Sequence, residues 1–255
     1  MKRRGGMFEG KAGVIVGGTS GIGKATALAF ARLGAAVVVS GRRANEGQQV
    51  ADEIAGAGGK AVFLPVDVAD EASIAALIDD SVRQFGSLDF AVNNAARELP
   101  AGLLHERTAE ECDAILSINV RGVFLGMKYQ LVQMLKQGNG AIVNIASSSA
   151  HKAVPYAALY TATKNAIVGL TQAAAVEYIK QGIRINAMSP GVVDTETLQR
   201  YVAGAGYTVA EMAAGYPIGR AADPDEIAQA ITWLCSPAAS FVVGHSLVAD
   251  GGMSI

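Results

Sequence analysis

Cysteine is scarce in this chain, and no other metal-ligand pattern replaces it. The 255 residues contain two cysteines, Cys112 and Cys235, which are far apart and lack a CxxC spacing. Neither a disulfide framework nor a zinc site is therefore expected. The three histidines are not spaced as ligands either. We predict no structural metal, and we interpret each cysteine as a core thiol.

Charge of one sign and long apolar runs are also missing. The formal net charge is −2 at pH 7, which gives no electrostatic reason to expect a nucleic acid or an anionic membrane surface as partner. No apolar run approaches the roughly 18 residues of a membrane-spanning helix. The basic cluster Lys2, Arg3 and Arg4 is followed by glycines rather than by an apolar segment. We therefore expect no signal peptide and a soluble, cytoplasmic protein.

Apolar residues are abundant, and they follow two alternating periodicities. They make up 51% of the 255 residues, enough for the large core of one domain spanning 1–255. Short β-branched runs predict seven strands, at 13–16, 36–39, 61–64, 90–92, 141–145, 184–187 and 246–248. Helical patterns lie near 22–33, 46–57, 73–85, 110–135, 159–179 and 225–235. This alternation predicts an α/β, doubly wound Rossmann fold with a seven-stranded, mostly parallel sheet and helices on both faces.

One region interrupts the alternation of strands and helices. Residues 195–219 contain helix-like fragments broken by Gly204, Gly206, Gly215 and Pro217. A long insertion beside a functional site is a candidate lid over that site.

A glycine-rich loop joins the first predicted strand to the first predicted helix. Glycines in such a loop allow a tight turn and a close approach to a pyrophosphate, which the positive end of the following helix favours. The spacing is G-x-x-x-G-x-G, which differs from the commonest dinucleotide fingerprint, and Ser20 has the alternative role of a simple helix cap. The loop residues expected to contact a dinucleotide are Gly17, Thr19, Ser20, Gly21, Ile22 and Gly23.

The end of the second predicted strand favours one dinucleotide over the other. NAD-binding folds usually place Asp or Glu there to hold the ribose 2′-hydroxyl, whereas this chain has Gly41 followed by Arg42 and Arg43. Two guanidinium groups suit a 2′-phosphate. We therefore favour NADP(H), with NAD(H) still possible and a solvated arginine loop as the alternative interpretation.

Tyr160 and Lys164 stand four residues apart on a predicted helix, and their side chains therefore leave the same face. A phenol that shuttles protons at neutral pH needs its pKa of about 10 lowered by about 3 units, or roughly 4 kcal/mol. One charge about 4 Å away at an effective dielectric of about 20 supplies about that much. The spacing alone is also compatible with two unrelated surface residues.

With the glycine-rich loop and the Tyr160 and Lys164 pair together, the chain from Lys11 to Gly252 resembles the short-chain dehydrogenase/reductase family in its compact form. Further motifs follow in the family's order, namely Asp67-Val68, Asn93-Asn94-Ala95-Ala96, Asn119, Ser147 thirteen residues before Tyr160, Pro190-Gly191 with Val193 and Thr195, and Asp250-Gly251-Gly252. Two positions depart from the family pattern: Ala96 stands where glycine is usual, and Val16 where threonine is usual. Taken singly, Asn119 and Thr195 could be helix caps and Ser147 a strand-end hydroxyl.

The resemblance implies roles for these residues. Asn119, Ser147, Tyr160 and Lys164 would form the catalytic set, with Tyr160 as general acid or base and Asn119 positioning a water. Asp67, Val68, Asn93, Asn94, Ala95, Pro190, Gly191, Val193 and Thr195 would contact the cofactor, together with Tyr160 and Lys164. The expected reaction is hydride transfer between the nicotinamide and a carbonyl or secondary alcohol. A predicted helix rich in small residues, and the resemblance, suggest a homotetramer.

Several alternatives stay open. A serine hydrolase would need a G-x-S-x-G elbow, which the sequence around Ser147 lacks. A dinucleotide-binding sensor without activity and an NAD-dependent alcohol dehydrogenase are the others. The substrate is not defined; Arg97, His151, Tyr156, Val192 and the segment 195–219 are the candidates for shaping its pocket.

Overall fold

A single sheet of seven strands runs through the centre of the protein. The computed structural model describes residues 6–204 and 206–255, and Lys2, Arg3 and Arg4 lie outside them. The strands are β1 Ala12–Val16, β2 Ala36–Gly41, β3 Lys60–Pro65, β4 Phe90–Asn93, β5 Gly140–Ile145, β6 Ile183–Pro190 and β7 Ser246–Ala249, in the spatial order β3-β2-β1-β4-β5-β6-β7. Every pairing is parallel. The predicted Rossmann fold is confirmed, and the sheet is fully rather than mostly parallel.

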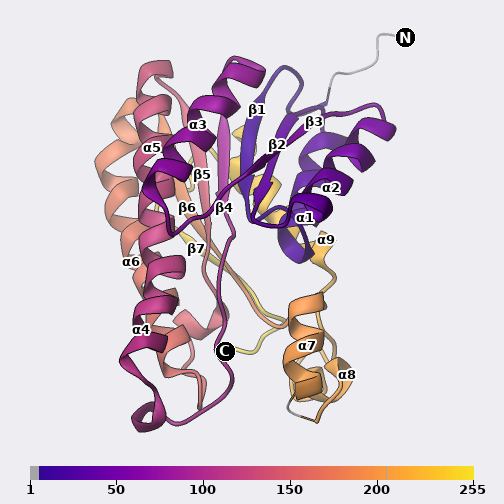
Figure 1. Ribbon diagram of the computed structural model, residues 1–255, viewed down its shortest axis with the longest axis vertical. Helices are drawn as coiled ribbons and strands as arrows, with labels where there is room; N and C mark the ends of the chain where they lie inside the picture. Colours follow the sequence, from indigo (N-terminus) through magenta and orange to yellow (C-terminus); the bar gives the residue numbers. More distant parts are fainter. Residues whose placement is uncertain (1–5, 205) are drawn as a thin grey trace.

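Helices cover both faces of the sheet (Figure 1). They are α1 Gly21–Arg32, α2 Ala44–Gly56, α3 Glu71–Phe85, α4 Ala109–Leu116, α5 Gly122–Gln137, α6 Ala158–Tyr178, α7 Glu196–Gly204, α8 Val209–Ala213 and α9 Pro224–Cys235. One core packs α3, α5 and α6 against the sheet, and the other packs α1, α2 and α9 against its opposite face. Because both faces are covered, β1, for example, is buried at every residue.

Local sequence signals set several helix ends. Asp70 begins α3 by accepting a hydrogen bond from the Ala72 amide, and Asp223 opens α9 with a capping box and Pro224 in the first turn. Gly86 and Gly138 end α3 and α5 with positive φ angles of 83° and 71°. These caps explain why the predicted boundaries of these helices lie close to the observed ones.

The helix predicted at 110–135 is not uniform. It consists of α4, a π-helical turn at Ser117–Arg121, and α5. A π-helical turn holds one more residue than an α-helical turn and is frequent at functional sites. Asn119 lies inside it, fully buried. One extra residue shifts the apolar face by about 100°, a single change of phase that is hard to recognise in one sequence, and a regular helix was predicted here.

A buried network of polar side chains joins the centre of the sheet to the helices behind it. The Asn93 amide donates to the Asn144 side-chain oxygen at 2.8 Å and exchanges hydrogen bonds with Gln130. The Asn144 amide donates to the Thr171 hydroxyl at 2.9 Å. These groups come from β4, β5, α5 and α6, so the network fixes how two strands and two helices are placed relative to one another.

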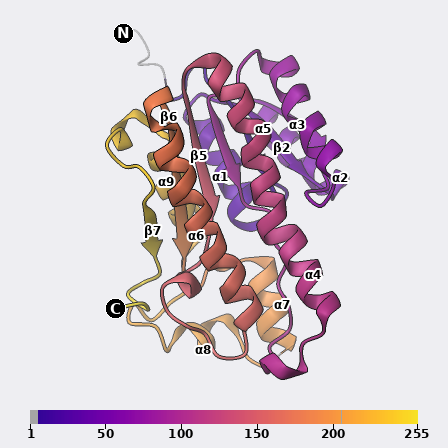
Figure 2. The same ribbon diagram turned by 90° about the vertical axis from the view of Figure 1, so that its left-hand side faces the viewer.

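The segment 195–219 forms α7, α8 and the turns that follow them. Figure 2 shows both helices beyond the carboxyl ends of the strands, close to the C-terminus of the chain. A β-bridge between Val193 and Ala222 brings the two ends of this segment together, and the Ile218 amide donates to the Gly251 carbonyl oxygen at 3.1 Å. Among the described residues, no helix is both long and apolar enough to cross a membrane.

Candidate functional site

A cleft of about 880 Å³ opens at the carboxyl ends of the strands, where doubly wound sheets bind their ligands. Most predicted site residues line it: Gly17, Thr19, Ser20, Gly21, Ile22, Arg42, Arg43, Asp67, Val68, Asn94, Ala95, Ser147, Tyr160, Lys164, Pro190, Gly191, Val193 and Thr195. Gly23, Asn93 and Asn119 are not lining residues. They lie behind the walls of the cleft and support them. Among the described residues there is also no cluster of potential metal ligands.

The glycine loop at one end of the cleft has no room for side chains. Gly17 has a φ of +84°, and a Cβ there would lie 2.7 Å from the Ala95 amide nitrogen. A Cβ on Gly23 would collide with the Gly17 carbonyl oxygen. The Asn94 side-chain amide donates to that same oxygen at 2.8 Å. This bond ties the loop to the end of β4 even though Val16 has replaced the usual threonine.

The first turn of α1 presents free backbone amides to the cleft. Ser20 occupies the N-cap position, but its side chain makes no capping hydrogen bond. The alternative interpretation of Ser20 as a simple helix cap is therefore wrong. The Arg43 guanidinium donates instead to the Ser20 hydroxyl and, at 2.9 Å, to the Thr19 hydroxyl. Uncapped amides at a helix N-terminus beside a guanidinium suit a phosphorylated ligand. The glycine loop therefore fits a dinucleotide pyrophosphate.

Position 41 ends the second strand, as predicted. A Cβ on Gly41 would lie 2.8 Å from the Thr19 methyl group, so an acidic side chain could not replace it without moving the loop. Arg42 is exposed, while Arg43 is half-buried through its bonds to the loop. Of the two arginines, the structure anchors Arg43 in the cleft wall.

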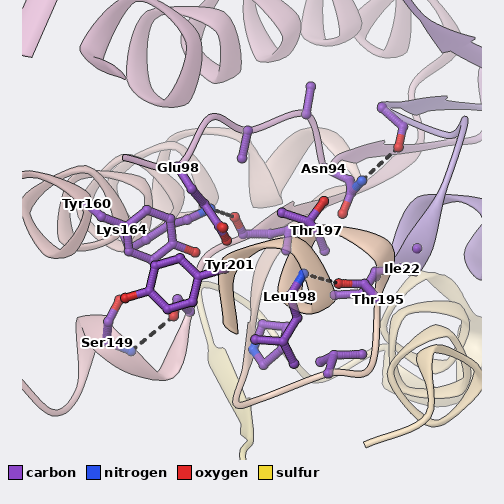
Figure 3. Close-up of a pocket in the computed structure, with 18 of the residues that line it drawn as sticks. Ile22, Asn94, Glu98, Ser149, Tyr160, Lys164, Thr195, Thr197, Leu198 and Tyr201 are labelled. Atoms are coloured by element: carbon purple, nitrogen blue, oxygen red, sulfur yellow. Dashed lines mark hydrogen bonds between the residues drawn. The ribbon is translucent and has the colours of Figure 1, made fainter. Parts of the chain in front are cut away.

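Ser147, Tyr160 and Lys164 meet at the other end of the cleft. Figure 3 shows Tyr160 and Lys164 side by side on one wall, opposite Asn94, Ile22 and Thr195. Lys164 is 2% exposed; its ammonium lies 5.4 Å from the centre of the Tyr160 ring and donates to the Ile145 carbonyl oxygen at 2.9 Å. Ser147 lies two residues after the end of β5. Its hydroxyl caps the short turn Ser148–Ala150 by accepting a hydrogen bond from the Ser149 amide at 3.1 Å.

The electrostatics of this trio differ from the sequence-based expectation. Burial raises the pKa of the Tyr160 phenol, the charge of Glu98 raises it further, and the hydrogen bond with Ser147 lowers it. Burial also lowers the pKa of Lys164 to about 8, against the opposing effect of Glu98. The predicted lowering of the phenol pKa by Lys164 is therefore not observed, because burial and the charge of Glu98 outweigh the hydrogen bond with Ser147.

Asn119 binds protein backbone. Its side-chain oxygen accepts from the Arg97 amide at 2.7 Å, and its amide donates to the Arg97 carbonyl oxygen at 2.9 Å and to the Thr163 hydroxyl at 3.2 Å. The side chain thus holds the segment after β4 against the helix that carries Tyr160 and Lys164.

The sequence prediction missed two charged residues of the cleft, Glu98 and Arg107. Of the predicted pocket residues, Tyr156 and Val192 line the cleft, but Arg97 and His151 do not. Arg97 is held by Asn119 through its backbone, and the His151 ring bonds to the Ser189 and Ser246 hydroxyls on β6 and β7. The sequence does contain a feature that could have identified Glu98, namely a carboxylate shortly after the Asn93–Ala96 motif.

The fold and this cleft define a dinucleotide-dependent oxidoreductase, and comparisons with known proteins agree. Residues 16–254 match the family model described as enoyl-(acyl carrier protein) reductase. The chain is 44% identical over 250 residues to 2,5-dichloro-2,5-cyclohexadiene-1,4-diol dehydrogenase of Sphingobium indicum, covering 97% of this chain and 98% of that one. It is 44% identical over 246 residues to cis-4-hydroxycyclohexanecarboxylate dehydrogenase of Sinomonas cyclohexanicum, covering 96% and 97%.

Solved structures give the same result. The crystal structure of an actinorhodin polyketide ketoreductase variant with NADPH superposes with a TM-score of 0.92 at 32% identity, covering 96% of this chain and 97% of that one. The chain belongs to the short-chain dehydrogenase/reductase family. It is an enzyme that acts on small-molecule alcohols or carbonyls with a nicotinamide dinucleotide.

Proposed function

We propose that this enzyme interconverts a cyclic secondary alcohol and its ketone with NADP(H), using Tyr160 as the general acid or base. The observation that supports this most is that one cleft contains both the glycine loop with Arg43 and the Ser147, Tyr160 and Lys164 trio. The cyclic substrate is suggested by the cyclohexane-type rings in the names of two relatives that match almost the whole chain.

The preference for NADP(H) is supported by the end of β2. Position 41 carries glycine in place of a carboxylate that would accept from a ribose 2′-hydroxyl, and Arg42 and Arg43 offer donors to a 2′-phosphate. Gly17, Gly21 and the first turn of α1 would hold the pyrophosphate, and Thr195 with the Pro190 to Val193 segment would hold the nicotinamide end. When bound, the cofactor supplies or accepts the hydride.

The protein's own groups supply position and proton transfer. In the reducing direction Tyr160 donates its proton to the carbonyl oxygen, and its raised pKa keeps the phenol protonated for that step. Ser147 donates a hydrogen bond to the same oxygen as negative charge develops there. Lys164, below pH about 8, is the positive charge that stabilises the phenolate once the proton has left. Asn119 holds the surrounding segments so that a water can link this trio to solvent.

We also propose that residues 195–219 act as a lid, within one domain spanning the chain. Leu198, Tyr201 and Met212 of this segment reach the cleft, so its position controls access. A homotetramer is supported by α6, on which Ala162, Ala166, Gly169 and Ala173 form an exposed stripe of small residues. A Cβ on Gly169 would meet no other atom within 4 Å, which leaves space for a neighbouring helix.

Tyr160→Phe tests the proposal. The variant should lose turnover of cyclohexanone with NADPH by at least about 100-fold, since general acid catalysis contributes about that factor or more, while its affinity for NADPH stays within a factor of about three. Tyr178→Phe is the matched control, because Tyr178 lies at the far end of the same helix, α6, and does not line the cleft. Full turnover by Tyr160→Phe would refute the assignment.

A further inference from the structure

Glu98 is a carboxylate without a partner in the catalytic end of the cleft. It follows β4 by five residues and lines the cleft together with Tyr160 and Lys164. Figure 3 shows its side chain directly beside those two residues, on the wall away from Asn94 and Ile22. Among the residues that the structure describes, none forms a hydrogen bond or an ion pair with its carboxylate.

The carboxylate of Glu98 is accessible to a ligand. Glu98 is exposed and its side chain opens into the cleft. The protein around it raises its pKa, an effect that the charges of Lys164 and Arg200 partly oppose. An accessible carboxylate beside the reacting groups can accept a charge-assisted hydrogen bond from a bound ligand. The geometry therefore favours a ligand group that donates a hydrogen bond.

The position of Glu98 indicates which ligand supplies that donor. The cofactor's phosphates would lie at the glycine loop and Arg43. Its hydroxyl and amide donors belong to the nicotinamide end, which Thr195 and the Pro190 to Val193 segment would hold across the cleft from Glu98. The group that reaches Glu98 is therefore part of the molecule that reacts at Tyr160. Its donor must lie a short distance from the reacting carbon, because Glu98 and Tyr160 are close enough for the carboxylate charge to raise the phenol pKa.

The charges around the site indicate a neutral donor. Lys164 and Arg200 both influence Glu98, so a substrate ammonium would meet two positive charges for one negative charge. A substrate carboxylate would be repelled by Glu98 itself. A hydroxyl donates to the carboxylate without adding charge, so it is the group that this arrangement accepts most readily.

We propose that Glu98 accepts a hydrogen bond from a second hydroxyl of the substrate, so that the preferred substrate is a cyclic diol, or the hydroxyketone formed from it. This rests on the proposed function. In the oxidising direction Tyr160 first releases its phenol proton to solvent, and the phenolate then accepts the O–H proton of the substrate. The carbinol C–H bond breaks, its hydride would pass to bound NADP⁺, and a C=O bond forms. The second hydroxyl is unchanged and serves only to hold and orient the ring.

The test compares diols with the matching single alcohol. Values of kcat/KM are measured with NADP⁺ for cyclohexanol, the cyclohexane-1,2-diols and the cyclohexane-1,4-diols, in wild type, Glu98→Gln, Glu98→Ala and the control Glu177→Gln. Glu177 is exposed on α6 and does not line the cleft. The readout is the ratio of the best diol to cyclohexanol within each protein. Any effect of Glu98 on Lys164 or Tyr160 acts on both substrates and cancels in this ratio.

Wild type and Glu177→Gln should prefer one diol by about 10-fold to 100-fold, the effect of one hydrogen bond to a charged group. Glu98→Ala should bring the ratio to about one, and Glu98→Gln should leave an intermediate ratio. A wild-type ratio near one, or a ratio unchanged by both Glu98 substitutions, would overturn the inference. So would a preference for 4-aminocyclohexanol or 4-hydroxycyclohexanecarboxylate over every diol.

These outcomes are separable from failure of the proposed function. If wild type oxidises none of the alcohols and reduces no cyclic ketone although it binds NADPH, the proposed function fails and the diol inference falls with it. If cyclohexanol is oxidised with no preference for a diol, the proposed function stands and only the role of Glu98 is refuted.

Discussion

Replacing Asn119 by alanine should destabilise the whole protein as well as slow its reaction. The substitution removes hydrogen bonds to the Arg97 amide at 2.7 Å, the Arg97 carbonyl oxygen at 2.9 Å and the Thr163 hydroxyl at 3.2 Å. A hydrogen bond is worth about 0.5–1.5 kcal/mol net, and more where the abandoned partner stays buried. Thr163 is fully buried and Arg97 is exposed, so we expect a total loss of about 2–4 kcal/mol.

Thermal unfolding measures this loss directly. For a chain of about this size each kcal/mol lowers Tm by about 2–4 °C, so Asn119→Ala should unfold roughly 4–16 °C below wild type. Asn139→Ala is the matched control, because Asn139 is exposed and its side chain makes a single bond, to the Gln137 carbonyl oxygen at 3.2 Å. If Asn119→Ala kept the wild-type Tm while losing activity, the side chain would act on the reaction alone and its role as a clamp on Arg97 would be refuted.

Two further predictions concern the two ends of the cleft. Arg43→Ala should weaken NADPH binding by about 10-fold to 100-fold through loss of a charge-assisted hydrogen bond and leave NADH binding nearly unchanged, with the remote Arg83→Ala as control. Calorimetric titration with both dinucleotides measures this, and an equal loss for NADH would contradict the 2′-phosphate assignment. Burial lowers the pKa of Lys164 to about 8, so the ammonium is charged below that pH and neutral above it. The kcat/KM for ketone reduction should therefore fall as pH rises through about 8, and a flat profile across that range would contradict the role of its charge.

Much of this fold could be predicted from periodicity because the strands are buried on both faces. Every predicted strand lies within or at an observed one, since a parallel sheet between two helix layers needs continuous apolar runs. β2 continues to Gly41, two residues beyond the predicted strand 36–39, because Ser40 and Gly41 pair with β3 although they are not apolar. The π-helical turn around Asn119 was not predicted, because it changes the phase of the apolar pattern only once, by about 100°, within a long helix.

Some features of the candidate site follow from spacing along the chain and could be predicted, whereas others depend on tertiary contacts and could not. The glycine loop, and Ser147 thirteen residues before Tyr160, are fixed by spacing along the chain, so the sequence could supply them. The burial of the phenol and the position of Glu98 depend on elements that meet only after folding. The pKa of Tyr160 is accordingly raised where the Tyr160 and Lys164 pair alone predicted a lower value. Arg97 and Glu98 are neighbours in sequence, but only Glu98 lines the cleft. The hydrogen bonds between Asn119 and the Arg97 backbone, which fix this segment, form only in the folded protein.

The buried network of Asn93, Gln130, Asn144 and Thr171 constrains how this enzyme can change over evolutionary time. Each member satisfies another, so a single apolar replacement leaves a buried amide or hydroxyl without a partner and costs about 1–3 kcal/mol. Substitutions there are tolerated only when partners change together, and such joint changes are rare. The cleft residues just beyond Asn93 and Asn144 are free of this coupling. Substitutions at the rim of the cleft can therefore change the substrate one residue at a time without leaving a member of this network unpaired.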